Sequence, residues 1–432
     1  MENKQLFLFP GVKEKTRKVA DRTSTFVNNA KLPIHRWFRY SAGFSAEWVK
    51  DVIEEFKHNN SIRLFDPFVG SGTTVLAGEE SGIKALGIEA HPFVVRIAKT
   101  KLLWGEDVDA FRGFAMGVLH YSENLEDAPK RYPKLIYKCY SEDVLNELDR
   151  LRRAWLHKND NSAVSKLTWL ALVGILRATS SAGTAPWQYV LPKKTKKEPV
   201  PPNKAFYSQV QMMIQDMLYF QSVVKEQKAR VFEDDARKCS EIEDDSVDLI
   251  ITSPPYTNNY DYADATRLEM SFLGEIQGWR DLQSRVRSRL IRSCSQHVSA
   301  EERDLESILS DKNLNPIIEG LREACRKLGK ERLSHGGRKN YHLMVAAYFS
   351  DLAKTWISLR RVCKEGAKVC FVVGNSASYG ILVPVDEWLG ELAISAGFKS
   401  YHFEKTRDRN VKWKIDRKHK VPLHEGRLWV EG

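Results

Sequence analysis

The stretch IRLFDPFVGSGTTVLAGEESGIKALGIE, residues 62–89, decides the fold class of this chain. It begins with an apolar run of strand type and passes through a loop that contains Gly70 and Gly72. It then continues as a short helical segment that ends at Gly82. A second apolar run, residues 85–88, is typical of another strand. Two strands joined by a helix in so short a space predict an α/β fold with a parallel, doubly wound, Rossmann-like sheet.

The alternation of strands and helices is interrupted twice further along the chain. Residues 105–229 and 275–340 are charged and mostly helical in pattern, so we expect them to be insertions into the sheet domain. Between and after them, apolar runs at 247–252 and 367–373 predict buried strands of the same sheet. Near the C-terminus, residues 401–405 and 428–430 are candidates for edge strands.

The overall charge points to a polyanionic partner. The 432 residues include 67 lysines and arginines against 56 aspartates and glutamates, a formal net charge of +11. Nucleic acid is the usual partner of such a protein. The 6 cysteines form no CxxC pair and the 11 histidines form no HxxxH cluster, so we expect no metal site. No apolar run approaches the roughly 20 residues of a membrane helix, and we expect a cytoplasmic protein without a membrane partner.

The glycine loop and two acidic residues predict a site for a nucleoside cofactor. The loop lacks the GxGxxG spacing of a nicotinamide site, and Gly72 is followed by Thr73 instead of the lysine of a phosphate-binding loop. Glu89 ends the next strand, where an acidic side chain meets ribose hydroxyls, and Asp235 follows a further strand at the same sheet edge. S-adenosylmethionine fits this pattern, with its ribose at Glu89, its adenine amino group at Asp235 and its methionine part over the glycines. An ordinary tight turn between strand and helix is the alternative.

A second loop predicts chemistry on an amino group. Thr252-Ser253-Pro254-Pro255-Tyr256 directly follows a buried strand, where two prolines are unusual because proline cannot continue the ladder. An exocyclic amino nitrogen of a base is a poor nucleophile that improves when its hydrogens donate to acceptors. The Ser253 hydroxyl and the Pro254 carbonyl are candidate acceptors, and Tyr256 can stack on a base flipped out of the duplex.

Taken together, the motifs resemble those of the DNA amino-methyltransferases. The residues that carry the resemblance are DPFVGSGTT at 66–74, GIEAHP at 87–92, DDAR at 234–237 and TSPPY at 252–256. The segment HRWFRYSAGFSAEW at 35–48 also looks like the family's N-terminal cofactor-closing element. The resemblance implies that S-adenosylmethionine is the cofactor and that the TSPPY loop binds the target amino group. Beside Glu89 and Asp235, it implies cofactor contacts for Asp66, Phe68, Gly70, Gly72, Thr73, Phe44 and Ser45.

The form of the second loop bears on the target base. A serine in its first position is typical of cytosine-N4 methyltransferases, whereas adenine-N6 relatives more often have Asp or Asn there. Methylation at cytosine C5 needs a cysteine after a proline, and no Pro-Cys pair occurs. We therefore expect cytosine N4 in DNA, with adenine N6 or guanine N2 in RNA as alternatives. A DNA-binding subunit without catalysis is the alternative outside enzymes.

The resemblance also suggests a division of the chain and its biological setting. A cognate restriction or defence component is a conceivable partner by family analogy, as is a prokaryotic, nucleoid-associated location. Some of the residues just after the second loop are expected to line the base pocket and others to be structural, namely Asn258, Asn259, Tyr260 and Tyr262. The arginines from 280 to 292 either contact DNA or only coat a helix. The expected parts are an N-terminal segment with the cofactor-closing element (1–60), three catalytic parts (61–104, 230–274 and 341–432) and two helical insertions (105–229 and 275–340). At least one insertion is expected to recognise DNA, and 275–340 is a candidate for target recognition.

Overall fold

The computed structural model describes residues 28–40, 43–57, 62–129, 131–185, 189–195, 198–226, 228–298, 304–337, 339–409 and 423–432. Within these residues the largest sheet has seven strands in the order β10-β11-β7-β6-β1-β2-β5. The strands are β1 (Arg63–Asp66), β2 (Lys84–Glu89), β5 (Ala229–Glu233), β6 (Val247–Thr252), β7 (Cys363–Gly374), β10 (Ser400–Arg409) and β11 (Leu423–Glu431).

The sheet is parallel except for one strand. β1, β2, β5, β6 and β7 pair in parallel, and β11 is antiparallel to both β7 and β10. When the seven strands are numbered in chain order, their arrangement is 3-2-1-4-5-7-6, so the order reverses between β1 and β6. The chain therefore has the expected α/β class, a Rossmann-like doubly wound sheet.

One expectation about the sheet edge is wrong. The run at 428–430 lies in β11, which pairs on both sides and is therefore an interior strand. Leu428 and Val430 are buried because they face the sheet core. The edge position belongs to β10.

The central strands supply both faces of the sheet with apolar side chains. In β1, Phe65 packs into one hydrophobic cluster and Leu64 into another, and in β7 Phe371 and Val372 divide in the same way. Successive side chains of a strand point to opposite faces, so a strand covered on both sides has a continuous apolar run. The helices that cover the faces are α1 (Ala46–Phe56), α2 (Thr73–Glu80) and α3 (Pro92–Lys101) on one side, and α12 (Ile318–Ser334), α13 (Tyr341–Val362) and α14 (Val385–Ser395) on the other.

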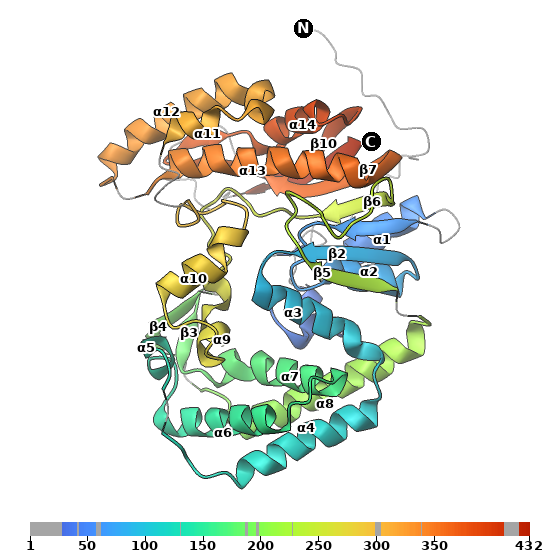
Figure 1. Cartoon of the computed structure of the whole chain (residues 1–432), viewed down its shortest axis with the longest axis vertical. Helices are drawn as coiled ribbons and strands as arrows, with labels where there is room; N and C mark the ends of the chain where they lie inside the picture. The colour runs from blue at the N-terminus through green and yellow to red at the C-terminus, as the bar shows by residue number, and fades with distance from the viewer. Residues whose placement is uncertain are drawn as a thin grey trace.

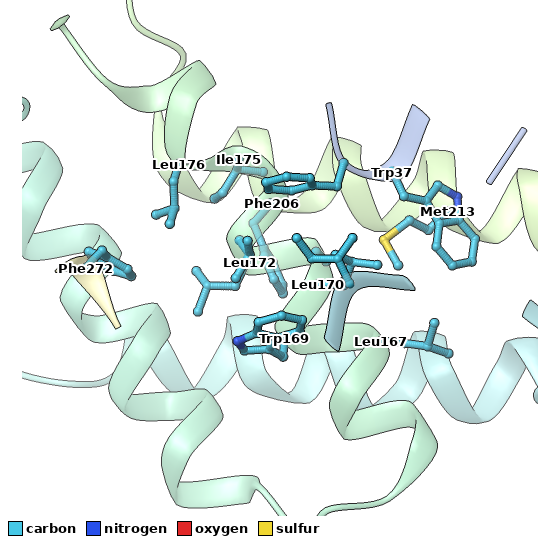
Figure 2. Close-up of a cluster of buried hydrophobic side chains, with 14 of the residues drawn as sticks. Trp37, Leu167, Trp169, Leu170, Leu172, Ile175, Leu176, Phe206, Met213 and Phe272 are labelled. Carbon is cyan, nitrogen blue, oxygen red and sulfur yellow. The ribbon is translucent and has the colours of Figure 1, made fainter. Parts of the chain in front are cut away.

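A separate hydrophobic core lies among the helices between β2 and β5. Figure 1 shows these helices at one end of the molecule and α12, α13 and α14 at the other, with the sheet between them. Figure 2 shows Trp169, Leu170 and Leu172 of α7 surrounded by apolar side chains from several elements, among them Trp37 of the N-terminal segment and Phe272. The helices are α4 (Val108–Glu123), α5 (Lys134–Tyr137), α6 (Glu142–Lys158), α7 (Ala163–Thr179) and α8 (Pro202–Val223).

The remaining elements are short. The stretch 180–204, which looks irregular in the sequence, contains a hairpin of β3 (Ala182–Thr184) and β4 (Val190–Thr195). α9 (Arg267–Phe272) lies between β6 and the second charged segment, which itself contains α10 (Trp279–Arg285) and α11 (Leu305–Leu309) before α12. A further hairpin follows β7 with β8 (Ser376–Ser378) and β9 (Ile381–Val383). All six cysteines are buried and free. None of the helices in the described ranges is long and apolar enough to cross a membrane.

Candidate active site

A cavity of about 310 Å³ lies beside the carboxyl ends of the central strands, where the strand order reverses. Ligands of open α/β sheets bind at such a reversal. Its volume falls at the lower end of the range for small-molecule sites, roughly 300 to 1,000 Å³. Residues from both predicted loops line it, together with the two acidic residues that follow neighbouring strands. They are Phe68, Gly70, Glu89, Asp235, Ser253, Pro255 and Tyr256.

The glycine loop approaches the cavity closely. Gly70 and Gly72 have φ angles of 52° and 97°, in the left-handed region that glycine adopts without a steric penalty. A Cβ on Gly70 would lie 3.4 Å from the ring of Tyr40. The loop and the segment before α1 therefore form one wall together, to which Gly43 also contributes.

Glu89 is held at the cavity by two backbone groups. The N–H of Gly70 donates to its Oε2 at 3.0 Å and the N–H of His91 donates to its Oε1 at 2.9 Å. Each carboxylate oxygen can accept a second hydrogen bond. Burial raises the pKa of Glu89 to about 7, although these backbone hydrogen bonds oppose the shift. The carboxylate is thus fixed in place and still able to accept hydrogen bonds from a ligand in the cavity.

Asp235 also reaches the cavity, but it has a strong partner. Its two oxygens accept hydrogen bonds from the guanidinium of Arg237, the shortest at 2.7 Å, and Oδ1 also accepts from the backbone N–H of Arg237. Arg237 in turn contacts buried Asp351 on α13. The carboxylate of Asp235 is therefore fixed in orientation by the helix behind it.

The Ser253 hydroxyl has a defined hydrogen-bonding role. It donates to the carbonyl oxygen of Val372 in β7 at 3.2 Å. A hydroxyl has one hydrogen and two lone pairs, so with its hydrogen committed to Val372 it presents acceptor capacity to the cavity. Tyr256 follows two residues after Pro254, and its backbone N–H donates to the hydroxyl oxygen of Tyr262 at 3.2 Å.

Aromatic rings make much of the cavity wall. Tyr40, Tyr256, Tyr260 and Tyr262 all line it. The rings of Tyr260 and Tyr262 meet edge to face with centroids 4.6 Å apart. Burial raises the pKa of Tyr256 far above its ordinary value, so the ring remains uncharged at neutral pH. Flat uncharged faces of this kind suit a stacked base.

Six predicted residues are not among those that line the cavity, and two of them, Asp66 and Ser45, make structural hydrogen bonds instead. Asp66 is buried and accepts hydrogen bonds from Thr74 Oγ1 at 2.6 Å and Thr252 Oγ1 at 2.5 Å. Burial raises its pKa to about 6 despite these hydrogen bonds. Ser45 accepts from the N–H of Trp48 at the start of α1. The full set behind the wall is Asp66, Gly72, Thr73, Phe44, Ser45 and Pro254.

The sequence patterns missed a third group of lining residues. Arg407 and Arg409 come from β10 and Glu425 from β11, and no motif marks them. Leu290 and Ile291 come from the second charged segment, so this segment reaches the cavity as well. Of the arginines between 280 and 292, Arg287 is buried in an ion pair with Asp261 and is unavailable to DNA.

Three potential metal ligands lie close together beside the cavity. Ligand atoms of Asp261, Cys294 and His297 lie within 4.8 Å of one another. His297 Nε2 is 3.2 Å from Asp261 Oδ1, and its Nδ1 is 3.1 Å from the carbonyl oxygen of Ile291. The guanidinium of Arg287 already neutralises Asp261, which disfavours a second cation. Hydrogen bonding accounts for this cluster.

The sequence is similar to those of known DNA methyltransferases. The sequence model of a DNA methylase family matches residues 4–100. The Type II methyltransferase M.BsoBI of Geobacillus stearothermophilus is 26% identical over 443 aligned positions, which cover 89% of this chain and 82% of the relative. M.AvaI of a Nostoc species is 27% identical over 87% of this chain and 81% of the relative, and M.MvaI of Kocuria varians is 22% identical over 87% and 84%.

The match to the family model covers the glycine loop and Glu89, and the longer matches extend over most of the chain. The sheet order, the cavity at its reversal and these relatives all support the DNA amino-methyltransferases as the family that this chain resembles.

Proposed function

We propose that this chain is a Type II DNA methyltransferase that methylates the exocyclic N4 amino group of cytosine. Family members take the methyl group from S-adenosylmethionine. The observation that carries the proposal is the hydrogen bond from the Ser253 hydroxyl to the carbonyl of Val372. It turns the hydroxyl into an acceptor at the carboxyl end of β6, where an amino group of a flipped base needs one.

The cavity wall fits the cofactor. Glu89 retains acceptor capacity for the two ribose hydroxyls, and Gly70 lets the backbone approach the methionine part closely. Phe68 and Tyr40 offer flat apolar surface. Asp235, fixed by Arg237, would accept from the adenine amino group.

Side chains of the TSPPY loop would promote the reaction by orienting the target base. The amino hydrogens would donate to Ser253 Oγ, which increases the electron density on nitrogen and orients its lone pair. Tyr256 stacks on the base and excludes water from one face. Positioning and electrostatics of this kind can supply most of the rate acceleration without a covalent intermediate.

The residues behind the wall support this arrangement. Asp66 joins the glycine loop to β6 through Thr252, and Ser45 begins α1, whose preceding segment reaches the cavity. We retain the division of the chain at 60, 104, 229, 274 and 340 as a proposal, with the segment 275–340 as the candidate reader of DNA sequence. A cytoplasmic location near the nucleoid and a cognate restriction enzyme belong to the same proposal.

The experiment is methyl transfer from labelled S-adenosylmethionine into duplex DNA of mixed sequence, followed by nucleoside digestion and mass spectrometry. We expect N4-methylcytosine, lost in Ser253→Ala and Tyr256→Ala and largely kept in Tyr256→Phe, which retains the ring. Ser246→Ala, at the amino end of β6, is the matched serine control, because its hydroxyl donates to Glu243 away from the cavity. N6-methyladenine would change the base and keep the mechanism. Label in RNA alone would refute DNA as the substrate.

A further inference from the structure

The β10–β11 hairpin adds charged side chains to a cavity wall that already contains Glu89, Asp235 and Arg289. Arg407, Arg409 and Glu425 line it, and Glu425 is only 6% exposed. Arg407 Nη2 donates to Glu425 Oε1 at 2.7 Å, and Arg409 Nε lies 3.9 Å from Glu425 Oε2. Two guanidinium groups thus share one carboxylate, which leaves a net positive charge in this part of the wall.

The position of Arg409 depends on its neighbours. Its Nη1 donates to the carbonyl oxygen of Asn375 at 3.1 Å. A Cβ on Gly374 would lie 2.8 Å from the backbone oxygen of His424 and 2.9 Å from the same Nη1, so glycine lets both β11 and the guanidinium approach closely there. The arginine is therefore held by a carboxylate on one side and a carbonyl on the other, which orders it before a ligand binds.

Arg409 also lies close to the TSPPY loop. Its Cζ is 5.6 Å from the centroid of the Tyr256 ring. The guanidinium lies over this ring, and Ser253, Tyr256 and Arg409 line the same cavity. A base that binds there with its amino group at Ser253 therefore has another part of its edge within reach of this guanidinium. A guanidinium has five N–H donors and no acceptor, so it selects for hydrogen-bond acceptors on that edge.

Cytosine and adenine differ in this respect. Beside its amino group cytosine carries two acceptors in sequence, the ring nitrogen N3 and the 2-oxo oxygen. Adenine carries the ring nitrogen N1 and then a C–H group, which would leave one guanidinium N–H without a partner. A site built to pair a polar group discriminates strongly against a ligand that lacks the matching group.

We infer that Arg409 is a specificity-determining residue that reads the N3 and 2-oxo edge of the flipped target cytosine, and that Glu425 and Arg407 hold it in place. This inference rests on the proposed methyl transfer to a flipped base and names the group that selects the base. It assigns this selection to a hairpin that follows the TSPPY loop by about 150 positions in the sequence.

The test uses one DNA duplex that contains a site mapped as methylated by the wild-type protein. In a second duplex the target cytosine is replaced by the C-nucleotide of 2-aminopyridine, which keeps the amino group and the adjacent ring nitrogen and lacks the 2-oxo group. The measurement is kcat/KM for both duplexes at alkaline pH, where the analogue is neutral. Wild type, Arg409→Gln and Lys405→Gln are compared, since Lys405 lies on the same strand and its side chain is half exposed. Binding of S-adenosylmethionine is measured for each.

We expect the analogue to lower kcat/KM of the wild type and of Lys405→Gln roughly ten- to a hundredfold, the scale of one bidentate base contact. For Arg409→Gln, kcat/KM should differ less than about threefold between the two duplexes, because this variant lacks the guanidinium that contacts the 2-oxo group. Equal kcat/KM of the wild type on both duplexes would overturn the inference without any variant, as would N6-methyladenine as its product. Cofactor binding without methyl transfer to any DNA would refute the proposed function itself and this inference with it.

Discussion

Asp66 lies behind the glycine loop and connects it to β6 and α2. Its carboxylate accepts hydrogen bonds from the Phe68 N–H, Thr74 and Thr252. The motif at 66–74 includes Asp66, but it did not predict that Asp66 has a structural role. A motif gives the order of residues along the chain and does not show which side chains face the cavity. The same reason separates Gly70, which lines the cavity, from Gly72, which does not.

Asp66→Asn should therefore destabilise the protein without removing a contact to the ligand. The amide NH₂ cannot accept a hydrogen bond, so at least one buried hydroxyl or N–H loses its partner, at a cost of about 1–3 kcal/mol in the free energy of unfolding. Asp107→Asn is the matched control, because Asp107 caps α4 and asparagine caps nearly as well. Urea denaturation measures both, and an equal change in the two variants would contradict the assignment.

The raised pKa of Glu89 predicts that cofactor affinity depends on pH. The ionised carboxylate is the better acceptor for ribose hydroxyls, and burial raises its pKa to about 7. As pH falls below 7 the protonated fraction grows, so Kd should rise by up to about tenfold per pH unit. Calorimetric titration with S-adenosylmethionine between pH 5.5 and 8.5 tests this. Glu89→Gln should bind weakly with little pH dependence between pH 5.5 and 7, and a wild-type Kd that stays constant there would refute the role of Glu89.

At the scale of elements, a buried ion pair joins the loop after β6 to the second charged segment. Arg287 and His297 both contact Asp261, and Asn259 accepts hydrogen bonds from Ser295. Leu290, between the two partners of Asp261, lines the cavity. This segment and the loop that follows the TSPPY motif therefore form one packed unit.

Breaking this pair should cost far more than breaking an exposed one. Asp261→Asn leaves the buried Arg287 uncompensated and should lower the free energy of unfolding by about 3–5 kcal/mol. Glu243→Gln, which removes the exposed pair with Arg63, should cost less than about 1 kcal/mol. Similar losses of unfolding free energy in the two variants, measured by urea denaturation at pH 7, would contradict a stabilising ion pair at Asp261.

The pH dependence of that difference has a defined sign. Burial alone would raise the pKa of Asp261, but hydrogen bonds from His297 and Arg287 lower it to about 2. A depressed folded-state pKa contributes stability above the ordinary pKa near 4 that is lost as pH falls toward 2. The gap between wild type and Asp261→Asn should therefore shrink below pH 4, and a constant gap down to pH 3 would exclude an ionised Asp261 as its source.

Sequence patterns predicted elements where the physical signal was local. The strands at 247–252 and 367–373 were recognisable because both of their faces are buried, and the glycine loop because its backbone needs positive φ. The interior position of β11 and the contribution of Arg409 were not predictable in this way. Both depend on which strands pair across the sheet, and that is decided by contacts far apart in the chain.

At the scale of the whole molecule, charge and fold have separate consequences. The net charge of +11 predicts strongly salt-dependent binding to DNA. For six to ten phosphate contacts, affinity should fall roughly 10³- to 10⁵-fold between 50 and 200 mM salt, whereas the affinity for S-adenosylmethionine should change little. Fluorescence anisotropy with labelled duplex measures the first and calorimetry the second. A loss of DNA affinity below tenfold would argue against a phosphate-dominated interface.

The position of β11 also has a consequence for the order of events during protein synthesis. In the described sheet β10 pairs only with β11, and β11 pairs with β7 on its other side. In a nascent chain that has left the ribosome only up to β10, this strand therefore has no partner strand to pair with. Arg407 and Arg409 then also lack Glu425, which holds them in the complete protein. Completion of the pocket has to wait for translation of Leu423–Glu431. A partly translated chain would accordingly lack the ordered arginines in the wall of the cavity.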